Sequence, residues 1–378
     1  MKTRFLLRIV PIFRPRLTVT IVLKITAVLA FFGILVLGGC GDNESPPDPE
    51  IPPADAYALT VPKNFPEPVF GFKQNPITKE GFELGRLLFY DPRLSSNNAI
   101  ACGTCHRQLF AFADHGHDVS HGVGDRLGSR NTTALQNLAF EPLFFWDGGV
   151  NHIELTPLNA ILNPNEMDES LAGVLNKLND NVAYKRQFKT AFGTDSITSQ
   201  LVLRAMSQFL GMLVSANSRY DNYVRGENNV QFTGSEKAGL ALFQQKCAAC
   251  HKPDLFTDHS YRNNGLDEMP RDKGRELITS NLADRGKFKV PSLRNVERTG
   301  PYMHDGRFYT LEAVLNHYSS GVKDSPTLDP LLKQNGSMGI PLTDAEKRDL
   351  IAFLKTLTDP TFIVDKRFLD PLGTSNQQ

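Results

Sequence analysis

The sequence predicts a mainly α-helical protein made of two similar domains, with long loops and little β structure. Three observations support this fold class. The chain has 378 residues, which suits two domains of ordinary size. Apolar residues recur with helical spacing in several segments, and no segment shows the apolar–polar alternation of a long strand. A short cysteine- and histidine-containing unit also occurs twice, each time after a predicted helix.

The N-terminus has the features of an export signal. Residues 1–39 contain six basic residues and no acidic residue, and their apolar run from Ile25 to Leu37 spans thirteen residues. This run is too short to cross a bilayer comfortably and fits the core of a signal peptide. It ends in Leu37-Gly-Gly-Cys40, which resembles the lipobox of bacterial lipoproteins. We expect a lipidated Cys40 that tethers the protein to the membrane, with an uncleaved anchor helix as the alternative.

The chain that follows this signal is mildly acidic. Loss of the six basic residues changes the formal net charge from 0 to −6, which argues against nucleic-acid binding. Residues 40–60 are rich in proline and acidic residues and are expected to form a disordered tether. The expected location is the periplasmic side of the cell envelope.

Helical patterns dominate the rest of the sequence. Two predicted helices begin with a capping box, at Thr233-Gly-Ser-Glu236 and at Thr343-Asp-Ala-Glu346. Stretches rich in Gly, Asn and Asp at 114–131 and 252–290 are predicted loops, and loops this long are usually functional. The predicted helices are 78–90, 168–178, 181–192, 197–222, 235–246 and 343–357.

A break in the helical pattern divides the chain into two domains. Gly226-Glu-Asn-Asn229 interrupts the pattern between the two copies of the repeated unit. Each domain therefore contains one copy. The expected organisation is an N-terminal domain over 61–226, a C-terminal domain over 227–358 and a tail over 359–378.

The repeated unit is the motif CxxCH, found as Cys102-Gly-Thr-Cys-His106 and as Cys247-Ala-Ala-Cys-His251. In this motif two thioethers fix the edge of a haem, and the adjacent histidine binds the iron. A zinc ribbon would need its cysteine pairs about 15–20 residues apart, whereas Cys105 and Cys247 are 142 positions apart. Disulfides within the pairs would leave the histidines unexplained. We therefore expect two covalent c-type haems, held by Cys102, Cys105 and His106 and by Cys247, Cys250 and His251.

Further motifs carry a family resemblance. Phe144-Phe-Trp-Asp-Gly148, Asn163-Pro-Asn-Glu-Met167 and Thr299-Gly-Pro-Tyr-Met-His-Asp-Gly306 resemble motifs of the bacterial di-haem cytochrome c peroxidase superfamily, which also contains the tryptophan-oxidising maturase MauG. The resemblance covers about residues 62–358. It implies two cytochrome-c-like haem domains packed side by side, with a calcium ion between them.

For the first haem, the resemblance implies a peroxide-reacting site. His106 corresponds to the proximal ligand of the iron, and Glu166 corresponds to the distal glutamate. A carboxyl group in that place can move a proton from one peroxide oxygen to the other, as a base and then as an acid. Trp146, the only tryptophan in the chain, corresponds to a relay between the haems.

For the second haem, the resemblance implies an electron-storage site with His251 as its proximal ligand. The family's distal ligand is Met in the peroxidases and Tyr in the MauG branch, and the corresponding residue here is Tyr318. A tyrosinate favours ferric iron and lowers the potential of the haem. His317 is the competing ligand, and an aromatic core role for Tyr318 is the other alternative.

Three further positions follow from the resemblance. Asn131 and the backbone carbonyls of Thr299 and Pro301 correspond to the calcium site, and oxygen donors suit this cation. His121 corresponds to a histidine that blocks the first haem in some peroxidases until activation. The family's distal-pocket glutamine has no clear counterpart in Thr156-Pro-Leu158.

The sequence thus supports a peroxidase that reduces hydrogen peroxide with electrons from a small donor, either a cytochrome c or a copper protein. The first alternative is a MauG-like oxidase that modifies aromatic residues of a partner protein. The second is an electron carrier in which both irons are permanently six-coordinate. Family members are often dimers, which leaves a homodimer open.

Overall fold

The computed structural model describes residues 57–334 and 336–373. The expected signal peptide, Cys40 and most of the expected tether lie outside these residues. The described part is mainly helical, with two small two-stranded antiparallel sheets, and it contains no helix long and apolar enough to cross a membrane. The helices are α2 (Lys79–Tyr90), α3 (Cys102–Cys105), α4 (Thr156–Leu162), α5 (Leu171–Asn179), α6 (Val182–Phe192), α7 (Ser199–Gly211), α8 (Arg219–Arg225), α9 (Gly234–Lys246), α10 (Glu276–Thr279), α11 (Leu311–Asn316) and α12 (Asp344–Lys355), and the strands are β1 (Tyr261–Arg262), β2 (Phe288–Lys289), β3 (Lys333–Gln334) and β4 (Ser337–Met338).

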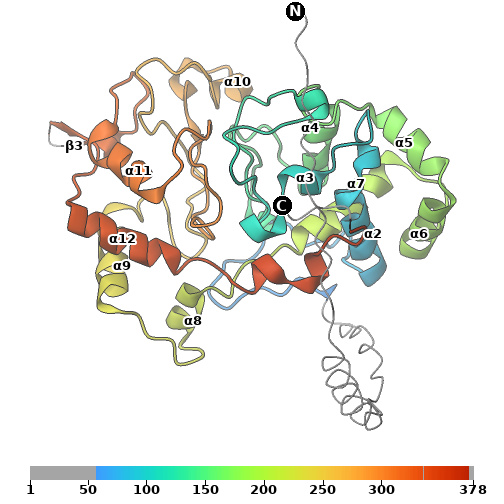
Figure 1. Ribbon diagram of the computed structural model, residues 1–378, viewed down its shortest axis with the longest axis horizontal. Coiled ribbons are helices and arrows are strands. Elements are labelled where there is room, and N and C mark those ends of the chain that lie inside the picture. Colours follow the sequence, from blue (N-terminus) through green and yellow to red (C-terminus); the bar gives the residue numbers. More distant parts are fainter. Residues whose placement is uncertain (1–56, 335, 374–378) are drawn as a thin grey trace, which may run out of the picture. The chain divides into compact units, whose positions relative to one another are not determined.

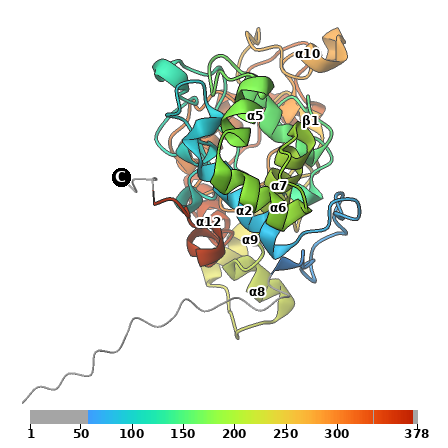
Figure 2. The same cartoon turned by 90° about the vertical axis from the view of Figure 1, so that its right-hand side faces the viewer.

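The helices form two halves that lie side by side (Figure 1). One half contains α2 to α7 and the other contains α9 to α12, and Figure 2 shows α2, α5, α6 and α7 gathered on the first half. The described residues belong to one compact unit. The prediction of a mainly α fold with two cytochrome-c-like domains is confirmed.

Each half is built on a helix pair in which a glycine allows close approach. In the first half α2 packs along α7, and in the second α9 packs along α12. A β-carbon on Gly85 would lie 2.0 Å from the carbonyl oxygen of Ala205, and one on Gly239 would lie 2.0 Å from that of Asp349. Glycine is therefore required at both crossings. In each pair the earlier helix precedes a CxxCH motif, so the internal repeat is structural as well as sequential.

The two capping boxes of the sequence are formed. Thr233 caps α9 and Thr343 caps α12, and each hydroxyl accepts a hydrogen bond from the backbone N–H of Glu236 or Glu346. The glutamate side chains accept bonds from the threonine N–H groups in return. These reciprocal bonds satisfy N–H groups that a helix start leaves without partners.

The helix predicted over 197–222 is instead two helices. Helix α7 ends at Gly211, an extended segment follows, and α8 begins after Ser218. Ser218 and Asp221 form a capping box of their own, with the serine hydroxyl bonded to the Asp221 N–H. The sequence Ser-Arg-Tyr-Asp carried this start signal, but the surrounding apolar periodicity masked it.

Three apolar residues show where the chain segments pack. Tyr220, in α8, lies in the second half's core with Phe243 and Phe353, so that core begins earlier than the expected boundary at 226/227. Phe362 and Phe368, in the expected tail, lie in the core of the first half. In Figure 1 the red segment after α12 accordingly runs back to the first half. Beyond residue 358 the chain therefore serves to bind the halves together as far as residue 373.

A buried polar network joins the halves near α8. The guanidinium of Arg294 donates two hydrogen bonds of 2.8 Å to the carboxylate of Asp221, and both side chains are fully buried. Arg294 also donates to the carbonyls of Asp254 and Ser215. Burial by itself raises the pKa of Asp221, but the bonds and charge of Arg294 outweigh it and lower the pKa overall. The pair is therefore ionised in the folded protein at neutral pH.

We expect Arg294→Met to destabilise the fold by about 3–5 kcal/mol, because it leaves the buried Asp221 carboxylate without its counter-ion. The measurement is chemical denaturation at pH 7 followed by circular dichroism. Lys333→Met, which breaks the exposed pair with Asp324, is the control and should have little effect. Since the Asp221 pKa is depressed, the stabilisation by the pair is present at neutral pH and is lost as the pH falls below about 4. Equal stability of the two variants at pH 7 would contradict the prediction.

Candidate di-haem site

The first CxxCH motif lies on the short helix α3, directly before a tight loop. The ring of His106 donates from Nδ1 to the carbonyl oxygen of Phe112 at 2.7 Å. This bond fixes the orientation of the ring and leaves Nε2 as the nitrogen that can bind a metal. Burial lowers the pKa of His106, so the imidazole is neutral at pH 7, as a metal ligand must be.

The second motif follows α9 and repeats this arrangement. His251 Nδ1 lies 3.2 Å from the carbonyl oxygens of both Phe256 and Pro291. Burial likewise lowers the pKa of His251. Two histidines in separate halves are thus held in the same way, by backbone carbonyls that select the same ring nitrogen for a metal.

The two phenylalanines that supply these carbonyls were missed by sequence reasoning. Phe112 and Phe256 have positive φ angles of 60° and 56° and are fully buried. Such φ values are rare for bulky residues and persist only where the surroundings enforce them. Their position after each CxxCH motif was the available signal, but backbone conformation cannot be read from it. We infer that the loops are held in this form to orient the proximal histidines.

A cavity of about 900 Å³ connects the two motifs. This volume is at the upper end of the range of about 300–1,000 Å³ for cofactor sites. The four motif cysteines lie on its wall and are not paired with one another in disulfides. No group of three or more His, Cys, Asp or Glu residues within 57–334 and 336–373 is placed to hold a metal ion by itself. The donor set therefore fits two covalent haems, with Cys102, Cys105 and His106 at one end and Cys247, Cys250 and His251 at the other.

Glu166 lies on the cavity wall in the first half. Its carboxylate accepts a hydrogen bond of 2.8 Å from the amide of Asn163. Burial raises its pKa, and the bond from Asn163 opposes this shift only in part. Pro157 and Leu158, from the stretch without a counterpart to the family's glutamine, also line the cavity. This part of the wall therefore combines apolar side chains with the Glu166 carboxyl group and the amides of Asn159, Asn163 and Asn165.

Tyr318 lines the cavity in the second half, whereas His317 does not. Both belong to a π-helical turn at His317–Gly321 that follows α11, and such turns are frequent at functional sites. The His317 ring donates from Nε2 to the carbonyl oxygen of Asn264 at 3.0 Å and is buried. Burial raises the pKa of Tyr318 to about 12. The geometry thus favours Tyr318 over His317 as the side chain facing a haem.

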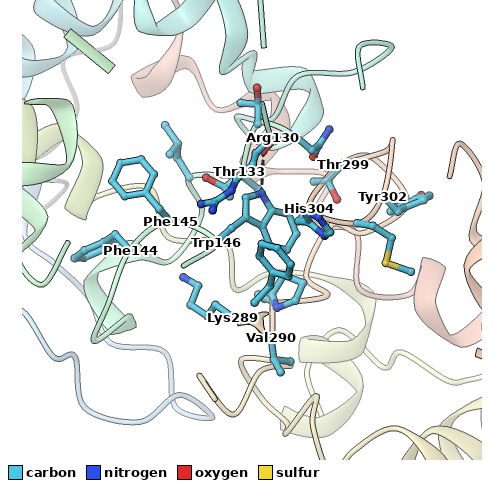
Figure 3. A pocket seen from close by; sticks show the side chains of 18 of the residues that line it. Arg130, Thr133, Phe144, Phe145, Trp146, Lys289, Val290, Thr299, Tyr302 and His304 are labelled. Atoms are coloured by element: carbon cyan, nitrogen blue, oxygen red, sulfur yellow. Dashed lines mark hydrogen bonds between the residues drawn. The ribbon is translucent and has the colours of Figure 1, made fainter. Parts of the chain in front are cut away.

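Trp146 lies where the two halves meet (Figure 3). Its indole N–H donates to the carbonyl oxygen of Asn131 at 2.9 Å, and its own carbonyl accepts from the N–H of Lys289 at 2.7 Å. One partner belongs to the first half and the other to the second, so the ring is held from the first half and the backbone from the second. Around the ring in Figure 3 lie Phe144 and Phe145 on one side, Thr299 and His304 on the other, with Arg130 above and Lys289 below.

An arginine clamps the tryptophan loop to the second half. Arg130 donates to the carboxylate of Asp147 at 2.6 Å and to that of Asp272 at 2.7 and 2.9 Å. Asp147 follows Trp146 directly, and Asp272 lies in the long loop before α10. The clamp therefore restrains the position of Trp146 relative to the second half.

The remaining predicted residues surround this junction. His121 lies on the cavity wall near Glu166, because Gly122 packs so closely on the backbone of Glu166 that a β-carbon would clash. Its ring, however, is bonded through Nδ1 to Asp125 at 2.7 Å. The cavity wall also includes all three residues of the expected calcium site, Asn131, Thr299 and Pro301.

We expect Cys247→Ala/Cys250→Ala to halve the covalent haem content, from two per chain to one, because the only cysteines left are the first motif and Cys40. The measurement is a pyridine haemochrome assay on protein separated by denaturing electrophoresis. Cys40→Ser is the control and should keep both haems. Two covalent haems in the double variant would contradict the assignment.

Comparison with known proteins also indicates a di-haem protein. The family described as di-haem cytochrome c peroxidase matches residues 79–229, and the cytochrome c family matches residues 236–358. The methylamine utilization protein MauG of Methylorubrum extorquens is 37% identical over 308 residues, covering 80% of this chain and 85% of that protein. The cytochrome c551 peroxidase of Nitrosomonas europaea is 31% identical, covering 77% and 84%.

Solved structures agree with these matches. A MauG-like protein associated with microbial copper homeostasis has a TM-score of 0.74 at 34% identity, covering 82% of this chain and 98% of that one. The di-haem peroxidase BthA from Burkholderia thailandensis shares the fold, with a TM-score of 0.67 at 24% identity, covering 75% and 87%. With two CxxCH motifs on one cavity and relatives along most of its length, this chain is an oxidoreductase of the di-haem cytochrome c peroxidase and MauG family.

Proposed function

We propose that this protein reduces hydrogen peroxide to water with electrons from a small redox protein, either a cytochrome c or a copper protein. The observation that carries the proposal is Glu166, a partly buried carboxyl group with a raised pKa on the wall of the cavity that the first CxxCH motif also lines. The haems supply redox-active iron. The chain's own contribution at the first site is a positioned base and acid for the protons of peroxide.

The residues divide this task between the halves. Asn163 holds the Glu166 carboxylate through its 2.8 Å bond, so the group has a fixed direction. His106 and His251 would each hold one of the two haem irons through Nε2. Trp146, fixed by backbone bonds to both halves, couples the second site to the first. Electrons enter at the second site and are used at the first.

A MauG-like oxidase is the second candidate, and Tyr318 is the observation that favours it. In this function the two oxidised haems withdraw electrons from aromatic residues of a partner protein. An anionic oxygen ligand at the second haem stabilises oxidised iron, which suits oxidation of a partner more than acceptance of electrons from a donor. The names of two relatives, a MauG and a cytochrome c551 peroxidase, cover both functions.

The deciding experiment is steady-state consumption of hydrogen peroxide with a reduced cytochrome c or a reduced copper protein as donor. Sustained turnover supports the peroxidase. Turnover that is weak with both donors, together with peroxide-dependent modification of aromatic residues in a partner protein encoded nearby, supports the oxidase. Failure of the reduced protein to bind carbon monoxide would support a simple electron carrier instead.

We expect Trp146→Phe to slow donor-supported turnover by about tenfold or more, which is about 1.4 kcal/mol in the barrier. The substitution keeps an aromatic ring but removes the indole N–H that bonds to Asn131. Stopped-flow spectroscopy measures oxidation of the second haem after peroxide is mixed with half-reduced protein. Tyr309→Phe, at an exposed ring, is the control. Unchanged rates of haem oxidation in Trp146→Phe would rule out the relay.

Further assignments complete the proposal. Export to the periplasm and anchoring through lipidated Cys40 are proposed from the N-terminal sequence pattern. A detoxifying enzyme tethered in this oxidising compartment would meet peroxide there. A calcium ion at Asn131, Thr299 and Pro301 would brace the junction around Trp146. His121 would close the first site until the second is reduced. A homodimer remains open.

A further inference from the structure

We propose that His117 and His121 form a binding site for a divalent transition metal ion, separate from the haem irons. The two imidazole rings lie with their centres 4.6 Å apart and their planes inclined by 34°. Both belong to the loop that follows the first CxxCH motif. The inference goes beyond the proposed function and shares only His121 with it.

Each ring is oriented by its own carboxylate. His117 Nδ1 lies 3.1 Å from the Asp114 carboxylate, and His121 Nδ1 lies 2.7 Å from the Asp125 carboxylate. A carboxylate at Nδ1 fixes the tautomer that leaves the Nε2 lone pair free and raises the basicity of the ring as a ligand. Among the described residues neither Nε2 atom has a hydrogen bond to the protein. Two oriented imidazoles with free Nε2 atoms are thus presented side by side.

The two carboxylates that orient the histidines differ in burial, so His117 is held rigidly and His121 is not. Asp114 is buried and is also bonded to Arg107 at 3.2 Å, so its hold on His117 is part of the core. Asp125 is exposed. The third histidine of the loop, His115, is engaged elsewhere: its ring stacks on Phe110, and its Nδ1 lies 3.1 Å from the carbonyl oxygen of Gly300. His115 is therefore a matched control within the same loop.

Solvent reaches the pair, and the donor set indicates the kind of ion. The His117 side chain is 51% exposed and the His121 side chain 35%. The described residues provide no third His, Cys, Asp or Glu that would complete a three-residue metal cluster, so the ion would be held by the two histidines with its other positions open to solvent. Imidazole ligands suit Zn²⁺, Cu²⁺ and Ni²⁺. An open two-histidine site binds such an ion exchangeably.

The site lies next to the first haem site, so a bound metal ion would also affect the first haem. The carbonyl oxygen of His121 lies 3.8 Å from Cys105 Sγ, and Gly122 packs against Glu166. A metal ion on the pair would hold the His121 ring beside His117, in the position that it has in this structure. The bound ion would thus oppose any movement of His121 toward the first iron.

The test is isothermal titration of the tag-free, haem-loaded protein with Zn²⁺ alone, which is redox-silent. We expect one Zn²⁺ per wild-type chain. His117→Ala and His121→Ala should each weaken binding at least tenfold, and Asp125→Asn should weaken it by about 10–100-fold through loss of the orienting carboxylate. His115→Ala should bind as the wild type does. Cu²⁺ should bind more tightly than Zn²⁺ to the same site.

Absence of saturable Zn²⁺ binding, or equal affinity in the wild type, His117→Ala and His121→Ala, would overturn the proposal. Unchanged haem absorption and circular dichroism spectra of each variant show that lost binding is not lost folding. The titration contains no peroxide and no electron donor. If the protein binds Zn²⁺ but does not turn over peroxide, only the proposed function is refuted. If it turns over peroxide but does not bind Zn²⁺, only this metal site is refuted.

Discussion

Glu166→Gln lowers kcat/KM for hydrogen peroxide by about 10²–10⁴-fold, the usual contribution of a positioned general acid–base group. The glutamine keeps the size of the side chain and a bond to Asn163, but it cannot take up and return a proton. Haem content, absorption spectra and the binding of the donor protein should not change. The assay is initial-rate consumption of peroxide at limiting concentration with saturating reduced donor.

Glu169→Gln is the matched control, because Glu169 lies three residues further along the chain and pairs with Lys177 at 2.6 Å rather than lining the cavity. Its activity should equal that of the wild type. If Glu166→Gln also retains full activity, then the proton is moved by another group or by solvent, and the carboxyl group is only structural.

The pH dependence of the same rate constant follows from the raised pKa. Glu166 must be ionised to take the first proton, so activity is lost as the pH falls through its pKa. Burial raises that pKa, so the acid limb of the kcat/KM profile lies above the ordinary glutamate value of about 4.3. Asn163→Leu removes the bond that favours the carboxylate and should move the limb to still higher pH. If the acid limb of the profile does not move in Asn163→Leu, then the group that titrates in this limb is not Glu166.

Local signals in the sequence predicted those parts of the fold that local physics decides. The capping boxes at Thr233 and Thr343 satisfy helix-start N–H groups within a few residues, so both helices begin where the sequence places them. The course of the chain after α12 depends instead on where Phe362 and Phe368 find apolar partners nearly 300 residues away, such as Phe82. No local pattern contains that information.

The candidate site also has some features that the local sequence predicts and others that depend on the folded chain. CxxCH is a contiguous motif, so the sequence alone predicts which cysteines and histidines would hold the haems. The carbonyls that orient those histidines come from Phe112 and Phe256, and their role depends on a left-handed backbone that only the packed loop enforces. The pairing of His117 with His121 likewise depends on the path of a loop, because spacing alone does not distinguish these histidines from His115.

Tyr318→Met is expected to raise the midpoint potential of the second haem by about a few tenths of a volt, within the span of about 0.8 V that axial ligands control. Methionine is a neutral ligand that favours ferrous iron, whereas tyrosinate favours ferric iron. The raised pKa of Tyr318, about 12, shows that the phenol is protonated at neutral pH unless a metal displaces its proton. Spectroelectrochemical titration measures the potential of each haem separately.

The two substitutions at position 318 distinguish its roles. Electron paramagnetic resonance of ferric Tyr318→Phe should lose the low-spin signal of the second haem and keep the signal of the first, because phenylalanine supplies no ligand atom. His317→Gln is the control, since that ring is bonded to the carbonyl oxygen of Asn264 away from the cavity. Loss of the signal in His317→Gln but not in Tyr318→Phe would reverse the assignment.

If Tyr318→Met raises the potential and also increases peroxide turnover with a donor, then tyrosine at this position is what holds the wild type toward the oxidase function. If it raises the potential without changing turnover, then electron entry at the second haem does not limit the peroxidase.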